Sequence, residues 1–154
     1  MTVLSAGLLL YRRNGSAPLD VWIAHMGGPF WARKDVHAWS IPKGEYTDDE
    51  DPLAAARREF TEEIGTPPPA AEYAALGMFR QPSGKRLTIY AGEADFQPER
   101  ISSNTFPLEW PKGSGRIQEF PEIDRAQWFS EPEARTKLVV GQLPILDALI
   151  RHLG

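Results

Sequence analysis

The sequence predicts an α+β fold, with helices on both faces of a β-sheet. Short runs rich in strand-forming residues lie on both sides of one central helical pattern at residues 52–64, and an amphipathic helix follows at residues 143–153. Turn-forming clusters separate these runs. A chain of 154 residues, of which 42% are hydrophobic, suits one compact core, so we expect a single domain over residues 1–154.

The first part of the chain is predicted to form paired strands. Residues 5–12 and 19–25 are rich in β-forming residues and flank a turn cluster at Asn14, Gly15 and Ser16, which favours their pairing. A loop, a further extended segment and a turn are expected at residues 27–31, 38–41 and 43–49.

The second part of the chain predicts a hairpin, a long excursion and two further helices. The hairpin strands and their turn cover residues 72–80, 86–96 and 81–85. Residues 97–115 are rich in Pro, Ser, Gly and Asn and predict an ordered surface excursion over the core, whose Phe106 and Trp110 are either functional or anchor the loop. Extended segments are expected at residues 117–120 and 126–129, and Ser130 begins a capping-box pattern that opens a helix. The apolar residues of the last helix are Leu143, Leu146, Leu149, Ile150 and Leu153.

The central helix has one apolar stripe and one acidic sector. At 100° per residue, Leu53, Ala56, Phe60 and Ile64 share one side, whereas Glu59, Glu62 and Glu63 occupy an adjacent sector. Asp49 or Asp51 can cap the start, Pro52 suits the first turn, and Gly65 before three prolines ends the helix. Like charges at this spacing destabilise a helix by roughly 0.2 to 0.5 kcal/mol per pair. A hard divalent cation would offset that cost, and oxygen ligands suit Mg²⁺ or Mn²⁺.

These residues also carry a family resemblance. Residues 44–66 resemble the Nudix box of pyrophosphohydrolases, with its glycines and charged positions filled by Gly44, Glu50, Arg58, Glu59, Glu62, Glu63 and Gly65. Phe60 suits one aliphatic position of the pattern, and Thr66 departs from the other. The order of elements over residues 5–129 is similar to the Nudix fold, an α/β/α sandwich with a mixed β-sheet between helices.

The resemblance implies roles for the box residues. Glu59, Glu62 and Glu63 would bind the divalent ion, together with the backbone carbonyl of Gly44, and either Glu59 or Glu63 would also deprotonate water. Arg58 is expected to hold the Glu59 carboxylate by a forked hydrogen bond. Glu50 would either favour the helix start through the macrodipole or stabilise the loop or metal-bound waters.

Residues outside the box have weaker support. Lys43 either contacts a substrate phosphate, as its similarity to diadenosine and inositol polyphosphate hydrolases implies, or is a solvated turn lysine. The remaining candidates are more often structural or surface residues: Glu119 and Glu122 as extra ligands, Arg80, Lys85 and Arg86 as phosphate contacts, and Trp31, Trp39 and Trp110 as base-stacking residues. His25, His37 and His152 are too scattered for a ligand set and are expected to be solvated or capping residues.

The resemblance predicts a metal-dependent hydrolase that cleaves a nucleoside diphosphate derivative by attack of water on phosphorus. Nucleoside triphosphates and dinucleoside polyphosphates are the leading substrates, followed by ADP-ribose and nucleotide sugars. The alternative from another class is a non-catalytic Nudix-fold nucleotide-binding or interaction module, although all box acids are retained. A prenyl diphosphate isomerase is disfavoured because the chain contains no cysteine.

Composition and charge indicate the setting and the partners. The net charge of −4 disfavours broad or sequence-specific nucleic-acid binding. No apolar run is long enough for a membrane span, and residues 1–5 lack the features of an export signal, so a cytoplasmic protein is expected. The expected partner is a small nucleotide diphosphate derivative, and the protein is expected to be a monomer or homodimer.

Overall fold

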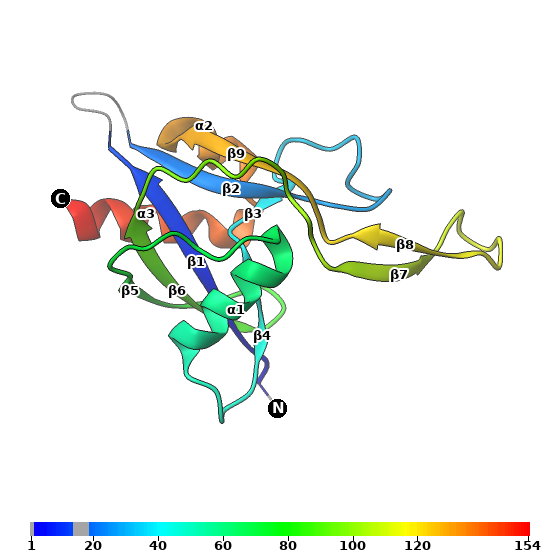
Figure 1. Ribbon diagram of the computed structural model, residues 1–154, viewed down its shortest axis with the longest axis horizontal. Coiled ribbons are helices and arrows are strands. Elements are labelled where there is room, and N and C mark those ends of the chain that lie inside the picture. Colours follow the sequence, from blue (N-terminus) through cyan, green and yellow to red (C-terminus); the bar gives the residue numbers. More distant parts are fainter. Residues whose placement is uncertain (1, 14–18) are drawn as a thin grey trace.

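The computed structural model describes residues 2–13 and 19–154, and within them helices cover both faces of a mixed β-sheet (Figure 1). The strands are β1 (Leu4–Arg12), β2 (Asp20–Met26), β3 (Trp39–Ser40), β4 (Lys43–Tyr46), β5 (Ala74–Arg80), β6 (Arg86–Glu93), β7 (Thr105–Glu109), β8 (Ile117–Pro121) and β9 (Ile123–Ser130). The helices are α1 (Pro52–Ile64), α2 (Glu131–Lys137) and α3 (Leu143–Leu153), with a short 3-10 turn η1 (Val140–Gln142). The turn predicted at residues 14–16 lies outside the described residues.

The sheet is built around β1, which has different partners along its two edges. On one edge β1 runs parallel to β6 from Leu4 to Tyr11. Its other edge is divided, because β2 pairs antiparallel with its last residues and β4 pairs antiparallel with its first. β2 then continues away from β1 and pairs with β3 and β9. β2 and β4 therefore share this edge of β1.

Side chains from β1 alternate between two separate cores. Leu8 and Leu10 face α1 and join its buried Ala56 and Phe60, whereas Leu9 lies in the core beneath α3. Every residue from Ser5 to Tyr11 is buried. A strand buried on both faces becomes a continuous apolar run, which is why residues 5–12 do not alternate in polarity. The prediction of helices on both faces is confirmed.

Local signals predicted the ends of α1 correctly. The Asp51 side chain accepts a hydrogen bond from the backbone N–H of Ala54 at 3.0 Å, and Pro52 begins the helix. Gly65 ends it in the left-handed conformation, with φ of 88°. The preceding segment differs from the prediction, because residues 43–46 form β4 rather than part of a turn. This strand occupies the edge of β1 that β2 leaves, which satisfies backbone groups that would otherwise lack partners.

The predicted excursion at residues 97–115 is partly wrong. Its first half crosses beside α1, where the Ser102 N–H donates to the Ile64 carbonyl at 2.9 Å. Its second half contains β7, which pairs with β8 in a two-stranded ribbon that projects away from the main sheet (Figure 1). Pro107 lowers the strand signal of this segment, but an edge strand tolerates a residue without an N–H.

Two further expectations are corrected by burial. His25, expected to be a solvated or capping residue, is fully buried, with Nδ1 2.8 Å from Asp124 and Nε2 2.7 Å from the Lys34 carbonyl. On α3, Ile150 is 44% exposed, and Ile145 takes its place in the core. Ser130 caps α2 as predicted. No helix within the described residues is long and apolar enough to cross a membrane.

Candidate active site

An acidic cleft of about 390 Å³ lies beside the divided edge of β1. It is bounded by the first half of β1, by β4, by the second half of α1, and by residues from three distant connections. These elements contribute Ser5, Lys43, Gly44, Glu45, Glu59, Glu62, Glu63, Lys85, Asn104 and Glu122. The structure therefore brings together five of the six predicted site residues, and the sixth, Arg58, does not line the cleft.

Glu63 is the least exposed of the box glutamates. Only 8% of the residue is accessible, and Oε1 accepts a hydrogen bond from the backbone N–H of Lys43 at 2.8 Å. Burial raises the pKa of this carboxyl to about 7, although the Lys43 N–H and charge oppose the rise. Glu63 can therefore hold or release a proton near neutral pH.

Glu59 lies against Gly44 at the base of the cleft. A Cβ atom at Gly44 would overlap the Glu59 carboxylate, so only glycine allows this approach of β4 to α1. Burial raises the pKa of Glu59, and the charges of Glu62 and Glu122 add to the rise, whereas the hydrogen bond from Arg58 opposes it. The contact with Glu59 thus gives a steric reason for a glycine at position 44.

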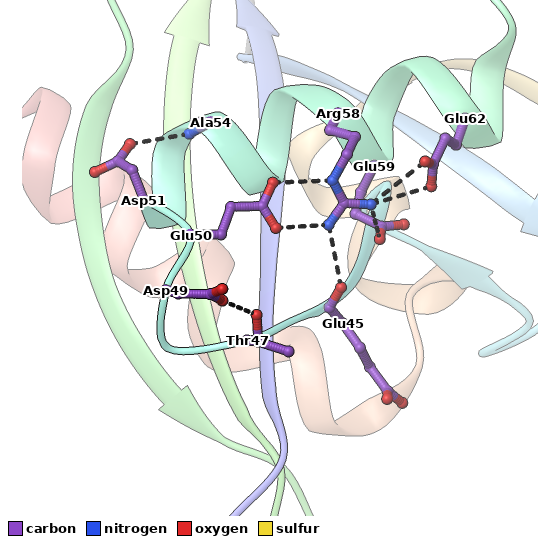
Figure 2. Close-up of polar contacts among 9 residues, drawn as sticks. All are labelled: Glu45, Thr47, Asp49, Glu50, Asp51, Ala54, Arg58, Glu59 and Glu62. Atoms are coloured by element: carbon purple, nitrogen blue, oxygen red, sulfur yellow. Dashed lines mark hydrogen bonds and ion pairs between the residues drawn. The ribbon is translucent and has the colours of Figure 1, made fainter.

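Arg58 does not line the cleft, but its guanidinium contacts several of the acidic residues at once (Figure 2). Its Nε and one terminal nitrogen contact the two oxygens of Glu50, each at 2.9 Å. The other terminal nitrogen contacts Glu59 at 2.9 Å and Glu62 at 3.3 Å. The predicted fork therefore binds Glu50 rather than Glu59, which receives a single hydrogen bond.

This geometry also explains Glu50. Its carboxylate contacts Arg58 instead of lining the cleft, and the hydrogen bonds from Arg58 lower its pKa. The interaction fixes the loop before α1 against the helix. Of the two interpretations of Glu50, the structure favours the loop-stabilising contact.

The two acids considered outside the box have different positions. Glu122 lines the cleft beside Glu59 and Glu63, whereas Glu119 points elsewhere from the exposed β8 strand. Glu122 is placed by Asn104, whose carbonyl accepts the Glu122 N–H at 2.9 Å and whose own N–H donates to Glu62 O at 3.0 Å. Asn104 was missed by sequence reasoning, since nothing in its neighbourhood signals a contact with α1.

Two lysines supply positive charge to the cleft. Lys43 lines it at the start of β4, and Lys85 reaches it from the turn between β5 and β6, where Nζ lies 3.0 Å from Glu45. Arg80 and Arg86, which were also considered as phosphate contacts, do not line the cleft. Trp39 is buried and donates to Asp35 at 3.0 Å, which excludes it from base stacking.

The donor chemistry of the cleft fits a hard divalent cation. Within the described residues no three acidic or histidine side chains form a ready-made ion site, because Arg58 holds Glu59 and Glu62 while the Lys43 N–H holds Glu63. All the acidic donors are nevertheless carboxylate oxygens, which Mg²⁺ and Mn²⁺ prefer. The raised pKa values of Glu59 and Glu63 reflect burial and mutual repulsion that a cation would relieve.

Comparison with known proteins decides the family. A family model described as the NUDIX domain matches residues 1–149. The chain belongs to the Nudix family. An RNA pyrophosphohydrolase from Hahella chejuensis is 44% identical to it, over 68% of this chain and 68% of that protein. These two matches confirm the predicted assignment to the Nudix pyrophosphohydrolases.

Solved structures confirm the Nudix fold. The Ap4A hydrolase of C. elegans, in a binary complex, superposes with a TM-score of 0.66 at 16% identity and covers 97% of each chain. The NUDIX domain of Shewanella oneidensis NrtR, complexed with ADP ribose, superposes with a TM-score of 0.64 at 16% identity, over 100% of this chain and 90% of that one. At these identities the likeness concerns the fold alone.

Proposed function

We propose that this Nudix protein uses Mg²⁺ or Mn²⁺ to hydrolyse a phosphoanhydride in a nucleoside diphosphate derivative, by attack of water on phosphorus. The observation that carries the proposal is the cleft in which Glu59, Glu62, Glu63 and Glu122 converge beside two lysines. A diphosphate needs local positive charge to enter such a cleft, and a chain of net charge −4 does not supply it globally.

In this proposal Glu59, Glu62 and Glu63 hold the cation, with the backbone of Gly44 close by. When bound, the cation would neutralise phosphoryl oxygens and make a bound water more acidic. Arg58 is a positioning residue, because it fixes Glu59 and Glu62 without lining the cleft.

Glu59 and Glu63 remain the two candidates for the general base. A pKa of about 7 suits Glu63 to accept a proton from water at neutral pH, and its hydrogen bond from Lys43 N fixes one carboxylate oxygen. Glu59 is already held by Arg58. The structure thus favours Glu63 for proton transfer. The Lys43 and Lys85 side chains would contact phosphate oxygens.

Nucleoside triphosphates and dinucleoside polyphosphates are the proposed substrates, ahead of ADP-ribose and nucleotide sugars. The relative from Hahella chejuensis, named as an RNA pyrophosphohydrolase, adds RNA as a second candidate. A phosphoanhydride occurs in RNA only at a terminal polyphosphate, so the cleft would receive the end of the strand. This candidate agrees with a protein that lacks the overall positive charge of general nucleic-acid binders.

A panel experiment tests the proposal. The protein is incubated with Mg²⁺ or Mn²⁺ and with nucleoside triphosphates, dinucleoside polyphosphates, ADP-ribose, nucleotide sugars and a 5′-triphosphorylated oligoribonucleotide. Products are scored as phosphate, pyrophosphate and mononucleotide. Glu63→Gln should lose turnover, and Glu119→Gln serves as the matched control with an exposed carboxylate outside the cleft.

The experiment also tests the non-catalytic alternative. A nucleotide-binding module would bind a member of the panel without releasing products, and Glu63→Gln would leave that affinity unchanged. Absence of cleavage with every substrate and both cations would refute the hydrolase proposal.

A further inference from the structure

A second concavity, of about 310 Å³, lies between the loop after β2 and the β7–β8 ribbon. Unlike the acidic cleft, it is lined only by glycine, proline, leucine and aromatic residues. The lining residues that matter here are Gly28, Phe30, Trp31, Phe106, Leu108 and Trp110. Phe106 and Trp110, for which the sequence left open a functional or an anchoring role, therefore line the same pocket.

The pocket has an ordered floor and exposed rims. Phe106 packs over Gly28, where a Cβ atom would lie 2.8 Å from the end of the ring and where φ is +92°. Phe106 is supported from behind by Phe120 on β8, with ring centroids 6.2 Å apart. At the rims, Phe30 is 61% exposed and Trp110 is 38% exposed. Large aromatic surfaces left in water around a concavity are typical of binding sites.

This aromatic pocket adjoins the acidic cleft, because lining residues of the two are hydrogen-bonded neighbours. The Gly27 N–H, at the edge of the pocket, donates to the Glu122 carbonyl at 2.8 Å, and Glu122 lines the cleft. Asn104 lines the cleft, and Phe106 lies two residues further along the same extended segment, at a rise of about 7 Å. A ligand with a diphosphate in the cleft can therefore place an attached ring system in the pocket.

Basic side chains lie on the two segments that form the pocket. Lys34 Nζ lies 3.6 Å from the centroid of the Phe30 ring, and Arg33 beside it is exposed. Lys112 and Arg116 are exposed at the far end of the ribbon. Aromatic rings combined with Lys and Arg are typical of sites that stack nucleobases beside a phosphate backbone.

We propose that the aromatic pocket binds the nucleobase of the substrate whose diphosphate occupies the acidic cleft. The location of the diphosphate rests on the function proposed above. Phe30 and Trp110 supply stacking surfaces, and Gly28 allows the Phe106 ring to form the floor. Since every base has a π face and the indole N–H groups of Trp31 and Trp110 are the only polar side-chain groups in the pocket lining, binding should discriminate weakly among the bases.

The test uses equilibrium binding, so that it does not depend on turnover. Isothermal titration with Mg²⁺ measures the affinity of the full chain for a nucleoside triphosphate analogue with methylene groups in place of both bridging oxygens. Inorganic tripolyphosphate is the probe without a base. Phe30→Ala and Trp110→Ala should each weaken binding of the analogue roughly 5- to 150-fold and leave tripolyphosphate binding unchanged.

Two further variants keep the test specific. Trp110→Phe should retain most of the affinity, because it retains an aromatic face. Ile117→Ala removes a 66% exposed side chain from the same ribbon but outside the pocket, and should bind as the wild type does. Unchanged analogue affinity in both alanine variants, or an equal loss of tripolyphosphate binding, would overturn the proposal.

The source of the base is distinguished by a second ligand. If the substrate is RNA, a 5′-triphosphorylated oligoribonucleotide should bind more tightly than the mononucleotide analogue and lose the same factor in the alanine variants. If the substrate is a free nucleotide, the additional nucleotides of the oligoribonucleotide should add no affinity. Base-dependent binding without hydrolysis would refute the proposed function and leave the nucleobase pocket supported.

Discussion

Replacing Glu63 with glutamine removes a buried acid while preserving its shape. The wild-type carboxyl is almost inaccessible, and its Oε1 accepts the Lys43 N–H at 2.8 Å. A glutamine Oε1 can accept the same hydrogen bond. The substitution therefore isolates two properties of Glu63, its charge and its ability to exchange a proton.

The expected effect on stability follows from the pKa. A rise from 4.5 in the unfolded chain to about 7 in the folded protein corresponds to about 3 kcal/mol. Since the folded pKa is the higher one, the contribution to stability is fully present below pH 4.5 and is lost as pH rises through 7. Glutamine does not titrate, so this loss should disappear in the variant.

Urea denaturation at pH 5 and pH 8.5, in the presence of a chelator, measures this difference. Between pH 5 and pH 8.5, the free energy of unfolding of Glu63→Gln should rise by about 2 to 3 kcal/mol relative to that of the wild type. In thermal melting, this corresponds to roughly 5 to 10 °C in the midpoint temperature. An unsatisfied amide N–H would lower stability by roughly 1 to 3 kcal/mol at both pH values and would leave the difference intact. Glu119→Gln controls for the loss of one exposed carboxylate.

Activity should change in the opposite direction. If Glu63 transfers the proton, turnover should fall roughly 10²- to 10⁴-fold while nucleotide affinity is retained. A variant that keeps wild-type turnover would refute this role. A variant whose stability follows pH as the wild type does would refute the burial argument. The combination expected here, a more stable and less active protein at pH 8.5, is typical of a strained catalytic group.

The remaining predictions concern the other parts of the site. Arg58→Lys should reduce Mn²⁺ affinity or activity roughly 10- to 100-fold, because a single ammonium nitrogen cannot reproduce the fork to Glu50 together with the contacts to Glu59 and Glu62. Calorimetry with Mn²⁺ measures the affinity, and unchanged affinity and activity would contradict the prediction. Gly44→Ala should displace the Glu59 carboxylate and abolish most activity while far-UV circular dichroism stays unchanged; an active variant would disprove the steric argument. Glu122→Gln should weaken Mn²⁺ binding and Glu119→Gln should not, and equal effects would show that position in the cleft is irrelevant.

Local sequence signals were sufficient for α1 because its determinants are near neighbours. Asp51, Pro52 and Gly65 act within one turn of the helix end that each defines, so their effect does not depend on the rest of the fold. The acidic sector follows equally directly from helical geometry. The box helix was therefore correct in its ends and in the burial of Ala56, Phe60 and Ile64, whereas Glu63, expected in a non-core sector, is buried.

Features that depend on distant partners could not be predicted in the same way. β4 forms because β2 leaves the first half of the β1 edge free. Nothing in the sequence of residues 43–46 indicates that this edge is available. The burial of His25 depends on Asp124, 99 positions away. Likewise, Glu119 and Glu122 have similar sequence surroundings, and only the path of the backbone after β8 places one of them in the cleft.

The end of α1 connects the box glutamates to the aromatic pocket. Carbonyls in the last turn of a helix need partners outside it, and here Ser102 N–H and Asn104 N–H supply them to Ile64 and Glu62. Gly65 permits this approach, since a Cβ atom there would lie 2.6 Å from the Ser102 carbonyl oxygen.

The segment that satisfies α1 thus also fixes Glu122 and begins β7, two residues before Phe106. Changes in the ribbon beyond Phe106 can alter which group is bound without moving the box carboxylates, because the backbone hydrogen bonds to α1 lie before it. Changes at Gly65 should instead disturb both the acidic cleft and the aromatic pocket. Gly65 therefore has two structural roles: it ends the helix, and it allows the close approach of the segment that joins the acidic cleft to the aromatic pocket.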